Sequence, residues 1–489
     1  MTALRIAVLG GGPAGLTAAR VLKRQQPTWA VTLFERQAPE RTYGYGVGLG
    51  WGALKRLQAA DADLVSALER ATVGVDTWTI RRGGESISAY NSHGLGIARA
   101  ELLSILAQHA VAAGVDVRGG TDMSAGDLDG FDVVIAADGV GSQTRQALAA
   151  ELGASVSHGE LAYLWAGAAL SLDAMTLALV QTPAGPLAAH VMPYAAGLAT
   201  FQVDARQSVF QNWPLTAAGA PTDPLAMLEE AFADLLQGSR LQAKRPQWQT
   251  FATVTCERWS HGKVVLAGDA VHTAHYSVGS GTGLAVEDGV ELAECLSGSA
   301  SVPEAFAAYE QARKPRVAKL QARADRSQRW WTSLDLRIDV PLPQLLLSYL
   351  TRTGAVTLAM AHETNQELIG QCLPAGVTEP AELADQSSRR WADSQHREAQ
   401  THTVHLVGGA SSVAADQLVE EVLDLTARGV TRVRVLGPGD RDAVLDRLEF
   451  AERLGAQTKV RTAVAGTAET RDTLLLGLLT GHTHHLEIS

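Results

Sequence analysis

The first 35 residues limit the possible folds of this chain more than any other segment. Leu4–Leu9 (LRIAVL) is a short apolar run, typical of a buried parallel strand. It leads directly into the glycine-rich loop Gly10–Gly15 (GGGPAG), and a helical pattern follows. A second apolar strand, Ala30–Phe34, ends at Glu35, about 20 residues beyond the loop. Strand, glycines, helix, strand and acid in this order predict a Rossmann-type unit that binds a dinucleotide.

Each residue of this fingerprint has its own physical role. Gly10 allows the tight turn, Gly12 lets backbone N–H groups approach a pyrophosphate, and Gly15 lets the helix pack closely on the strand. The helix N-terminus favours the phosphate charge. Glu35 would accept hydrogen bonds from ribose hydroxyls and would repel a 2′-phosphate, which argues against NADP but leaves NAD and FAD open. The expected cofactor contacts here are Gly10, Gly12, Pro13, Ala14, Gly15, Glu35 and Arg36.

Length and composition exclude several classes of protein. A chain of 489 residues suggests about three domains, and 46% hydrophobic residues exclude wholesale disorder. A net charge of −11 argues against broad binding of nucleic acid or of an anionic membrane. No apolar run reaches the ~18 residues of a membrane helix, and no signal peptide is evident. Three distant cysteines, Cys256, Cys295 and Cys372, form neither a disulfide framework nor a metal knuckle. We therefore expect a cytoplasmic protein without a metal site.

Two further motifs choose between the nucleotides. Asp132–Ala137 is a buried-strand pattern that leads into Asp138, and Lys263–Ala267 is another that leads through Gly268 into Asp269. Each motif puts an aspartate at the carboxyl end of a strand, where open α/β sheets bind ligands. A second glycine-rich helix start, Gly279-Ser280-Gly281-Thr282-Gly283, follows the second motif. Its dipole suits the negative charge of a reduced flavin, so the three motifs together favour FAD.

With these motifs in this order, the chain resembles the class A flavoprotein aromatic hydroxylases, which have the p-hydroxybenzoate hydroxylase fold. The resemblance covers about residues 1–335. It implies an α/β fold in which an antiparallel β-sheet substrate domain is inserted into a Rossmann-type FAD-binding domain. Ile97–Leu102 resembles the family segment that carries an FAD-binding arginine, here Arg99. The cofactor contacts implied in this part of the chain are Gly46, Val47, Arg99, Asp138, Asp269, Gly279, Gly281, Thr282 and Gly283.

The resemblance also implies the reaction. NADH or NADPH, bound transiently, reduces tightly bound FAD, and O₂ then gives a flavin hydroperoxide that transfers oxygen to an aromatic ring. The sequence contains no second GxGxxG unit for the nicotinamide, which agrees with the family and leaves NADH and NADPH undistinguished. Assembly as a homodimer is also left open.

Local departures from the family pattern indicate a subgroup. The chain has Tyr276 where the family typically has proline, and Gly283 where it typically has asparagine. The surrounding string, together with Tyr43–Gly48 and Leu187–Tyr194, resembles the salicylyl-CoA 5-hydroxylases and anthraniloyl-CoA monooxygenases. That resemblance implies an aryl-CoA substrate, with salicylyl-CoA 5-hydroxylated to gentisyl-CoA as the expected reaction. Two alternatives remain: a hydroxylase of a free phenol or an indole, as in violacein-type enzymes, and a flavin reductase without oxygen transfer.

We expect the substrate to bind against an antiparallel sheet. Four strand-length segments between Ala162 and Asp204 are joined by turn-rich breaks, which is typical of a meander. In the family such a sheet roofs the cavity over the flavin. A phenol needs a hydrogen-bond acceptor or a base, and the candidates are His275 and His190, although any single histidine can equally be structural. The expected substrate contacts on this side are Tyr45, Tyr194 and Tyr276.

A basic run lies in the long helical stretch Ser301–Leu334, which we expect to be interrupted near Pro315. Between Arg313 and Arg329 it has seven bases and one acid. The run is either a solvated helix face or a docking surface for the phosphates of CoA, with Arg323 and Arg326 as the contacts. Arg81-Arg82 is a second candidate of the same kind.

The predicted domain organisation follows from these segments. The FAD-binding domain is discontinuous, with parts at residues 1–75, 97–158 and 257–335. The substrate domain takes residues 76–96 and 159–256, and a helical segment with a polar linker, Asp385–Thr403, takes residues 336–403. Residues 404–489 alternate strand and helix and predict a small C-terminal α/β domain of unknown role.

Overall fold

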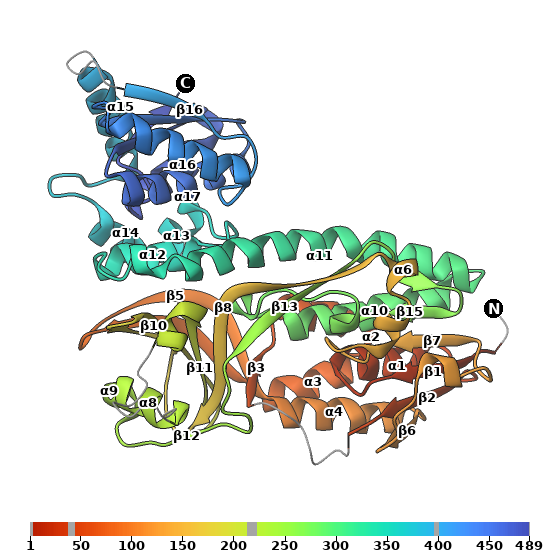
Figure 1. The fold of residues 1–489 in the computed structure, drawn as a ribbon. Helices are drawn as coiled ribbons and strands as arrows, with labels where there is room; N and C mark the ends of the chain where they lie inside the picture. The colour runs from red at the N-terminus through yellow and green to blue at the C-terminus, as the bar shows by residue number, and fades with distance from the viewer. Residues whose placement is uncertain (1–2, 38–44, 213–222, 396–400, 489) are drawn as a thin grey trace. The chain divides into compact units, whose positions relative to one another are not determined.

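The computed structural model describes residues 3–37, 45–212, 223–395 and 401–488 (Figure 1). The chain divides into two compact units. The first comprises Met1–Glu85 and Asn91–Thr332, and the second comprises Ser86–Tyr90 and Ser333–Ser489. No helix within the described ranges is long and apolar enough to cross a membrane.

The first unit contains a six-stranded sheet of Rossmann type. Its strand order is β14-β15-β7-β1-β2-β6, and only the edge strand β14 is antiparallel. Because the other five strands run the same way, the ends of β1, β2, β7 and β15 meet at one edge. The strands are β1 Arg5–Leu9, β2 Ala30–Glu35, β6 Asp116–Gly119, β7 Val133–Ala136, β14 Ser260–His261 and β15 Val264–Leu266.

Helices α1 (Pro13–Gln25) and α10 (Gly281–Gly298) pack against each other beside this sheet (Figure 1). Their approach depends on Gly289, where an added Cβ would lie 2.7 Å from the Ala14 carbonyl oxygen and 2.8 Å from the Ala18 nitrogen. The other helices of this part are α2 Trp51–Ala60, α3 Ala62–Ala71, α4 Arg99–Ala112, α5 Gln143–Ala147 and α6 Ala149–Leu152.

A nine-stranded sheet forms the other half of the first unit. Its path is β12-β8-β11-β10-β9-β4-β5-β3, and β13 also pairs with β8. The predicted antiparallel meander is confirmed, because β8, β11, β10 and β9 pair antiparallel in that order. The strands are β3 Gly46–Gly48, β4 Val73–Arg82, β5 Glu85–Ala98, β8 Ala154–Ala168, β9 Met175–Thr182, β10 Gly185–Ala195, β11 Leu198–Arg206, β12 Leu241–Gln242 and β13 Gln249–Cys256.

The two faces of this sheet differ in polarity, as strand β11 illustrates. Its residues Phe201 and Val203 are buried in an apolar core with helices α7 Gln207–Asn212, α8 Pro224–Ala231 and α9 Ala233–Leu236. The alternate residues Thr200, Gln202 and Asp204 are polar and point to the opposite face. That second face also carries His190 of β10, which pairs with Gln202.

Helix α11 (Val302–Thr332) runs along the first unit without a break (Figure 1). The expected interruption near Pro315 is therefore wrong. Proline removes its own N–H group, which would bond the carbonyl of Gln311, and its ring crowds that same carbonyl. Pro315 and Gln311 are both exposed, so water can satisfy that carbonyl and the helix continues.

The second unit contains the predicted small α/β domain. Its four parallel strands lie in sequence order: β16 Thr401–His405, β17 Arg432–Leu436, β18 Arg461–Gly466 and β19 His485–Ile488. The connecting helices are α16 Val413–Thr426, α17 Arg441–Thr458 and α18 Arg471–Leu479. Before them come α12 Leu342–Thr351, α13 Leu358–Thr364, α14 Gln366–Cys372 and α15 Pro380–Gln395.

The predicted polar linker Asp385–Thr403 is largely wrong. Residues up to Gln395 belong to α15, and β16 already begins at Thr401. The helix is amphipathic despite its polar composition: Trp391 is buried beneath the Arg432 guanidinium, 4.9 Å from the ring centre, and Ser387 accepts a hydrogen bond from the Leu486 N–H. These two contacts on one face of α15 hold the segment as a helix, although most of its residues are polar.

Substitution of Gly289 tests the packing of α1 against α10. Gly289→Ala should lower the free energy of unfolding by about 1–3 kcal/mol, because the new Cβ would overlap backbone atoms that cannot move aside. Chemical denaturation with the FAD content as a second readout measures this. Gly298→Ala in the same helix, where nothing lies within 4 Å of an added Cβ, is the matched control. Equal stability of the two variants would contradict the prediction.

Candidate active site

The glycine-rich loop after β1 is shaped for close contacts that only glycine permits. Gly10 has φ +101°, and a Cβ there would overlap the carbonyl of Ala137 at the end of β7. A Cβ on Gly15 would overlap the carbonyl of Gly10. By contrast, nothing lies within 4 Å of the Cβ position of Gly12, which caps α1 ahead of Pro13 and Ala14. The first turn of α1 is therefore open to a ligand.

Glu35 ends β2 beside this loop. Its Oε2 accepts a hydrogen bond of 2.6 Å from the Gly11 N–H, and its Oε1 accepts one of 2.8 Å from the Gln37 N–H. Arg36 follows it and is exposed. Glu35 thus also fixes the glycine-rich loop through its hydrogen bond from Gly11. Tyr43 and Gly44, quoted above for the subgroup, lie outside the described residues.

Asp138 follows β7 and presents a buried oxygen toward the same edge. Its Oδ2 accepts hydrogen bonds from the Thr144 N–H (3.2 Å) and the Thr144 hydroxyl (3.1 Å). Its Oδ1 is buried and has no hydrogen-bond partner within the described part of the chain. A buried carboxylate oxygen needs a donor, and a ligand hydroxyl or N–H could supply it.

Arg99 is electrostatically coupled to two of the predicted acids. It begins α4, and its N–H donates to the Tyr45 carbonyl over 2.7 Å. Burial lowers the pKa of the Arg99 guanidinium, and the charges of Asp269 and Glu35 oppose that shift. Desolvation by the surrounding protein raises the pKa of the Asp269 carboxyl, while the charges of His272 and Arg99 act in the other direction. The structure thus brings Arg99, Asp269 and Glu35 together.

The second glycine-rich segment and strand β3 lie side by side. Gly279 adopts φ +64°, and nothing lies within 4 Å of the Cβ positions of Gly279 and Gly281. A Cβ on Gly48 would lie 3.4 Å from the Gly279 carbonyl oxygen. Thr282 and Gly283 complete the first turn of α10, so the positive end of an 18-residue helix faces this open region.

Strand β3 is fixed to the nine-stranded sheet by one threonine. The Thr200 hydroxyl accepts a hydrogen bond from the Gly46 N–H and donates one to the Gly46 carbonyl, each over 2.9 Å. Tyr194 packs directly against Gly46, where no larger residue fits. Val47 pairs with Ile97 of β5, next to Arg99. Thr200 was missed from the sequence, although the apolar–polar alternation of Ala199–Arg206 carries its signal.

These features fit FAD. Two open helix N-termini, narrow glycine turns, the unpartnered oxygen of Asp138 and the Arg99–Asp269 pair match a long ligand with two phosphates and several hydroxyls.

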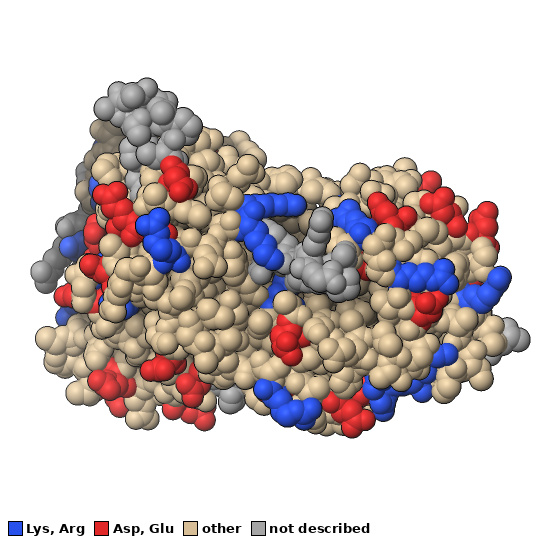
Figure 2. All heavy atoms as spheres, turned by 90° about the horizontal axis from the view of Figure 1, so that it is seen from below, with Lys and Arg blue, Asp and Glu red and all other residues tan. Residues whose placement is uncertain are grey.

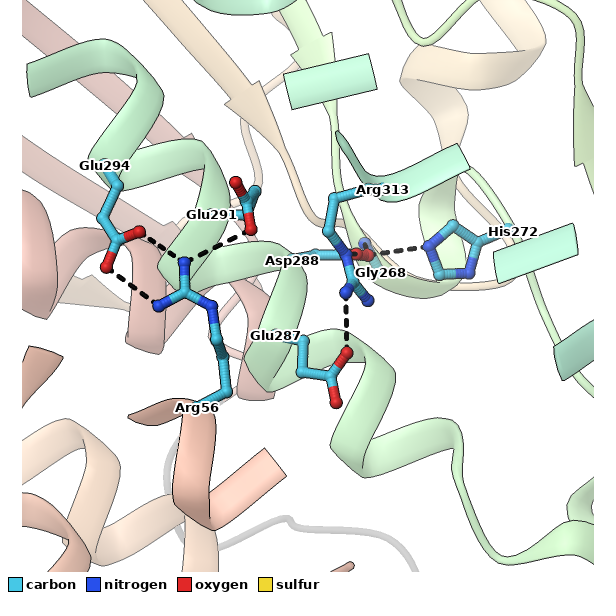
Figure 3. Close-up of polar contacts among 8 residues, drawn as sticks. All are labelled: Arg56, Gly268, His272, Glu287, Asp288, Glu291, Glu294 and Arg313. Carbon is cyan, nitrogen blue, oxygen red and sulfur yellow. Dashed lines mark hydrogen bonds and ion pairs between the residues drawn. The ribbon is translucent and has the colours of Figure 1, made fainter. Parts of the chain in front are cut away.

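A buried ionic network holds the Asp269 turn in place (Figure 3). Asp288 of α10 is fully buried, and its Oδ2 accepts hydrogen bonds from the Gly268 N–H (2.9 Å) and from His272 Nε2 (2.7 Å). Its Oδ1 accepts one of 2.8 Å from Arg313 of α11, which also bonds Glu287. Burial raises the pKa of Asp288, but His272 and Arg313 outweigh burial and the net shift is downward. In the sequence, Asp288 is marked as a carboxylate within the largely apolar helical stretch Leu284–Leu296.

A polar cluster lies on the second face of the nine-stranded sheet. Asp204 Oδ1 accepts hydrogen bonds from the Tyr276 hydroxyl (2.7 Å) and the Gln202 amide (3.1 Å). Asp204 Oδ2 lies 2.8 Å from His190 Nε2, and the His190 ring packs on Trp331 with centroids 4.4 Å apart. Two of the predicted residues, His190 and Tyr276, therefore share an acid that sequence reasoning missed.

His275 and Tyr45 lie near this cluster with other partners. His275 caps the short 3₁₀ turn Tyr276–Val278: its Nδ1 lies 2.9 Å from the Ser277 hydroxyl, and its ring lies 4.1 Å from that of Tyr276. Tyr45 donates a hydrogen bond to the Gln242 carbonyl, and its ring lies 6.4 Å from that of Trp165.

The basic run of α11 does not act as one surface. Arg313 is buried in the ionic network, Lys314 pairs with Glu310 over 2.8 Å, and Arg329 pairs with Asp325. Arg323 and Arg326 are half-buried on the same helix. On the face seen from below in Figure 1, basic and acidic side chains likewise lie in small mixed groups (Figure 2). Arg81 and Arg82 end β4, beside the Gly83-Gly84 turn.

Comparison with known proteins identifies the family. Residues 131–324 match the family described as FAD binding domain. The chain is 36% identical to salicyloyl-CoA 5-hydroxylase of Streptomyces sp over 363 residues, which cover 72% of this chain and 70% of that protein. It belongs to the FAD-dependent aromatic hydroxylases. It is also 36% identical to 3-hydroxy-4-methyl-anthranilyl-[aryl-carrier protein] 5-monooxygenase of Streptosporangium sibiricum over 355 residues, 72% of this chain and 95% of that protein.

The fold agrees with this family. The solved structure of 2-methyl-3-hydroxypyridine-5-carboxylic acid oxygenase superposes with a TM-score of 0.56 at 21% identity, covering 72% of this chain and 96% of that one. The predicted p-hydroxybenzoate hydroxylase-like fold is thus confirmed. The protein is an FAD-dependent aromatic monooxygenase.

Asp269 is the acid whose contribution to FAD binding can be measured most directly. Asp269→Ala should raise the dissociation constant of FAD about tenfold to a hundredfold, because it removes an acceptor and the charge beside Arg99. Fluorescence titration of the deflavinated protein measures this. Asp173→Ala, at an exposed position between β8 and β9, is the control. Stoichiometric FAD at unchanged affinity in Asp269→Ala would remove this role.

Proposed function

We propose that this hydroxylase acts on the aromatic ring of an aryl thioester, and that it converts salicylyl-CoA to gentisyl-CoA. The observation that carries the proposal is the 36% identity to two enzymes named for such substrates, one a CoA thioester and one an aryl-carrier protein. Both carriers present the aryl group on a phosphopantetheine arm. The shared chemistry is therefore an aryl group in thioester linkage.

The FAD site uses the residues at the carboxyl edge of the six-stranded sheet. The first turn of α1 binds the pyrophosphate, while Glu35, Asp138 and Asp269 accept hydrogen bonds from cofactor hydroxyls and Arg99 balances their charge. The N-terminus of α10 favours negative charge at the pyrimidine edge of the flavin. When bound and reduced by NADH or NADPH, FAD supplies the oxygen-activating chemistry.

The aromatic ring would lie between this cofactor site and the polar face of the nine-stranded sheet. Tyr45, Tyr194 and Tyr276 contribute walls, and the sheet excludes water from the reacting atoms. The 5-position of salicylyl-CoA is para to the ring hydroxyl, so removal of the phenol proton increases electron density where oxygen is added. His190 and His275 are the proton acceptors proposed for that hydroxyl.

The CoA portion would lie along α11. Arg316, Lys319, Arg323 and Arg326 have the spacing of one helical face, and each is at least partly exposed. Arg326 precedes Ser327, whose hydroxyl lies 2.8 Å from that of Ser277 beside His275. A docking site for the phosphates of CoA would therefore adjoin the proposed ring site.

Oxygen uptake with matched substrates tests the proposed function. The purified holoenzyme should consume NADH and O₂ with salicylyl-CoA, and the thioester product should gain one oxygen atom by mass spectrometry. Free salicylate should not stimulate this reaction. Turnover of salicylate loaded on a carrier protein, but not of salicylyl-CoA, would move the substrate to the second thioester class. Turnover of free phenols or indoles alone, or NADH oxidation without oxygen transfer, would replace the proposal with an alternative predicted from the sequence.

Reversal of two charges on α11 tests the docking of CoA. Arg323→Glu with Arg326→Glu should raise the KM for salicylyl-CoA about tenfold or more, because two attractive contacts to phosphate become repulsive. The KM for salicylyl-pantetheine, which has no phosphate, should not change. Arg70→Glu with Arg428→Glu makes the same change in net charge at exposed positions elsewhere. An equal rise in the KM for both substrates would show that the two arginines do not bind the phosphates.

A further inference from the structure

The polar cluster on the nine-stranded sheet has Asp204 at its centre. This side chain is only 2% exposed, and it receives two neutral donors on Oδ1, the Tyr276 hydroxyl and the Gln202 amide. Its other oxygen, Oδ2, faces His190 Nε2 at 2.8 Å. A buried carboxylate costs several kcal/mol unless it is paired, so the identity of its partners decides what it can do.

The contact between Asp204 and His190 is Coulombic rather than directional. The two atoms are close, but neither His190 Nε2 nor Asp204 Oδ2 meets hydrogen-bond geometry within the described residues. Such a pair gains most when the imidazole is positively charged. Because Nε2 faces the carboxylate, the charge of Asp204 favours hydrogen on Nε2 of the neutral ring and leaves Nδ1 as the acceptor. Packing against Trp331 fixes the ring plane.

We propose that Asp204 is a positioning residue for the hydroxylation. It orients His190 so that Nδ1 accepts the phenol proton of the substrate, and its charge stabilises the imidazolium that forms. In this step the phenol O–H bond breaks, its electron pair stays on the oxygen, and an N–H bond forms at Nδ1, while Asp204 remains ionised. The proposal rests on the phenolic substrate of the proposed function.

The other groups around the pair are compatible with this step. Burial, followed by the charge of Asp204, raises the pKa of Tyr276 well above its ordinary value, so that hydroxyl remains a neutral donor. Tyr163 of β8 packs on Tyr276 with ring centroids 4.8 Å apart. Arg206, two residues along β11, shares the face of Asp204 and is half-buried. From α11, the uncharged Ser327 and Trp331 contact the cluster, and the half-buried Arg326 lies next to Ser327 in the sequence.

His275 is less suited to the same task. Its Nδ1 lies against the Ser277 hydroxyl and caps the turn that carries Tyr276. Its neighbours Tyr276 and Phe251 are aromatic, with ring centroids at 4.1 and 5.1 Å. His190, by contrast, lies against the buried carboxylate of Asp204.

A nitrophenol probe tests the proposal without turnover. The probe is 5-nitrosalicylyl-CoA, whose nitro group blocks the position that would be hydroxylated and whose phenolate absorbs visible light. Its ionisation is followed by difference absorbance in complex with the oxidised holoenzyme across a range of pH. Asp204→Asn should raise the midpoint of this titration by about one pH unit or more, a tenfold loss of phenolate stabilisation. His190→Gln should give the same shift, and the double variant no further shift.

Two controls separate a positioning role from a structural one. Glu160→Gln makes the same acid-to-amide change at an exposed position of β8 and should titrate like the wild type. Asp204→Glu retains the charge and should restore part of the wild-type midpoint, which keeps the test decisive if Asp204→Asn does not retain FAD.

The failure of this proposal is distinguishable from failure of the proposed function. A wild-type midpoint in Asp204→Asn that binds the probe would overturn the role of Asp204, and so would additive shifts in the double variant. If the wild type does not bind the thioester probe, the aryl-CoA substrate is wrong. The same titration with free 5-nitrosalicylate then tests the Asp204–His190 pair, and equal midpoints in the wild type and Asp204→Asn would again overturn it.

Discussion

The arrangement of the cofactor site depends on one fully buried carboxylate, that of Asp288. It connects three segments distant in sequence: the turn at Gly268, the loop at His272 and helix α11 through Arg313 (Figure 3). The turn carries Asp269 to the edge where β1, β2 and β7 also end. Loss of one partner would leave an uncompensated buried charge, which typically costs 3–5 kcal/mol. The network therefore fixes the Asp269 turn relative to both α10 and α11.

The nine-stranded sheet contributes to the site because apolar and polar residues alternate along its strands and so occupy opposite faces. One face is an apolar core, and the other places Thr200, Asp204 and His190 on the side of β3 and of the turn at Tyr276. Thr200 couples the sheet directly to the strand that contains Gly46. The substrate side and the cofactor side are therefore joined by specific hydrogen bonds, and a shift of the sheet would also move β3.

Features with local physical causes were predictable from the sequence, and features that depend on long-range pairing were not. The strand–glycine–helix units and the meander follow from periodicity and turn residues, and the structure confirms both. Asp204 and Asp288 gain their roles from partners 14 to 72 residues away, such as His190 and Tyr276, so spacing along the chain does not identify those partners. The basic composition of α11 gives no signal for the role of Arg313 for the same reason, because its partner Asp288 lies on another helix.

The two buried aspartates differ in the charge and the alignment of their partners. Asp288 binds Arg313 and His272 with in-line hydrogen bonds, and these two side chains, together with the Gly268 N–H, occupy both of its oxygens. Its charge is already compensated, and its pKa lies below the ordinary range. Asp204 receives its aligned hydrogen bonds from the neutral Tyr276 and Gln202, while His190 lies close but out of line. A carboxylate beside a titratable ring attracts that ring more strongly once the ring takes up a proton, and this is the property that the role proposed for Asp204 requires.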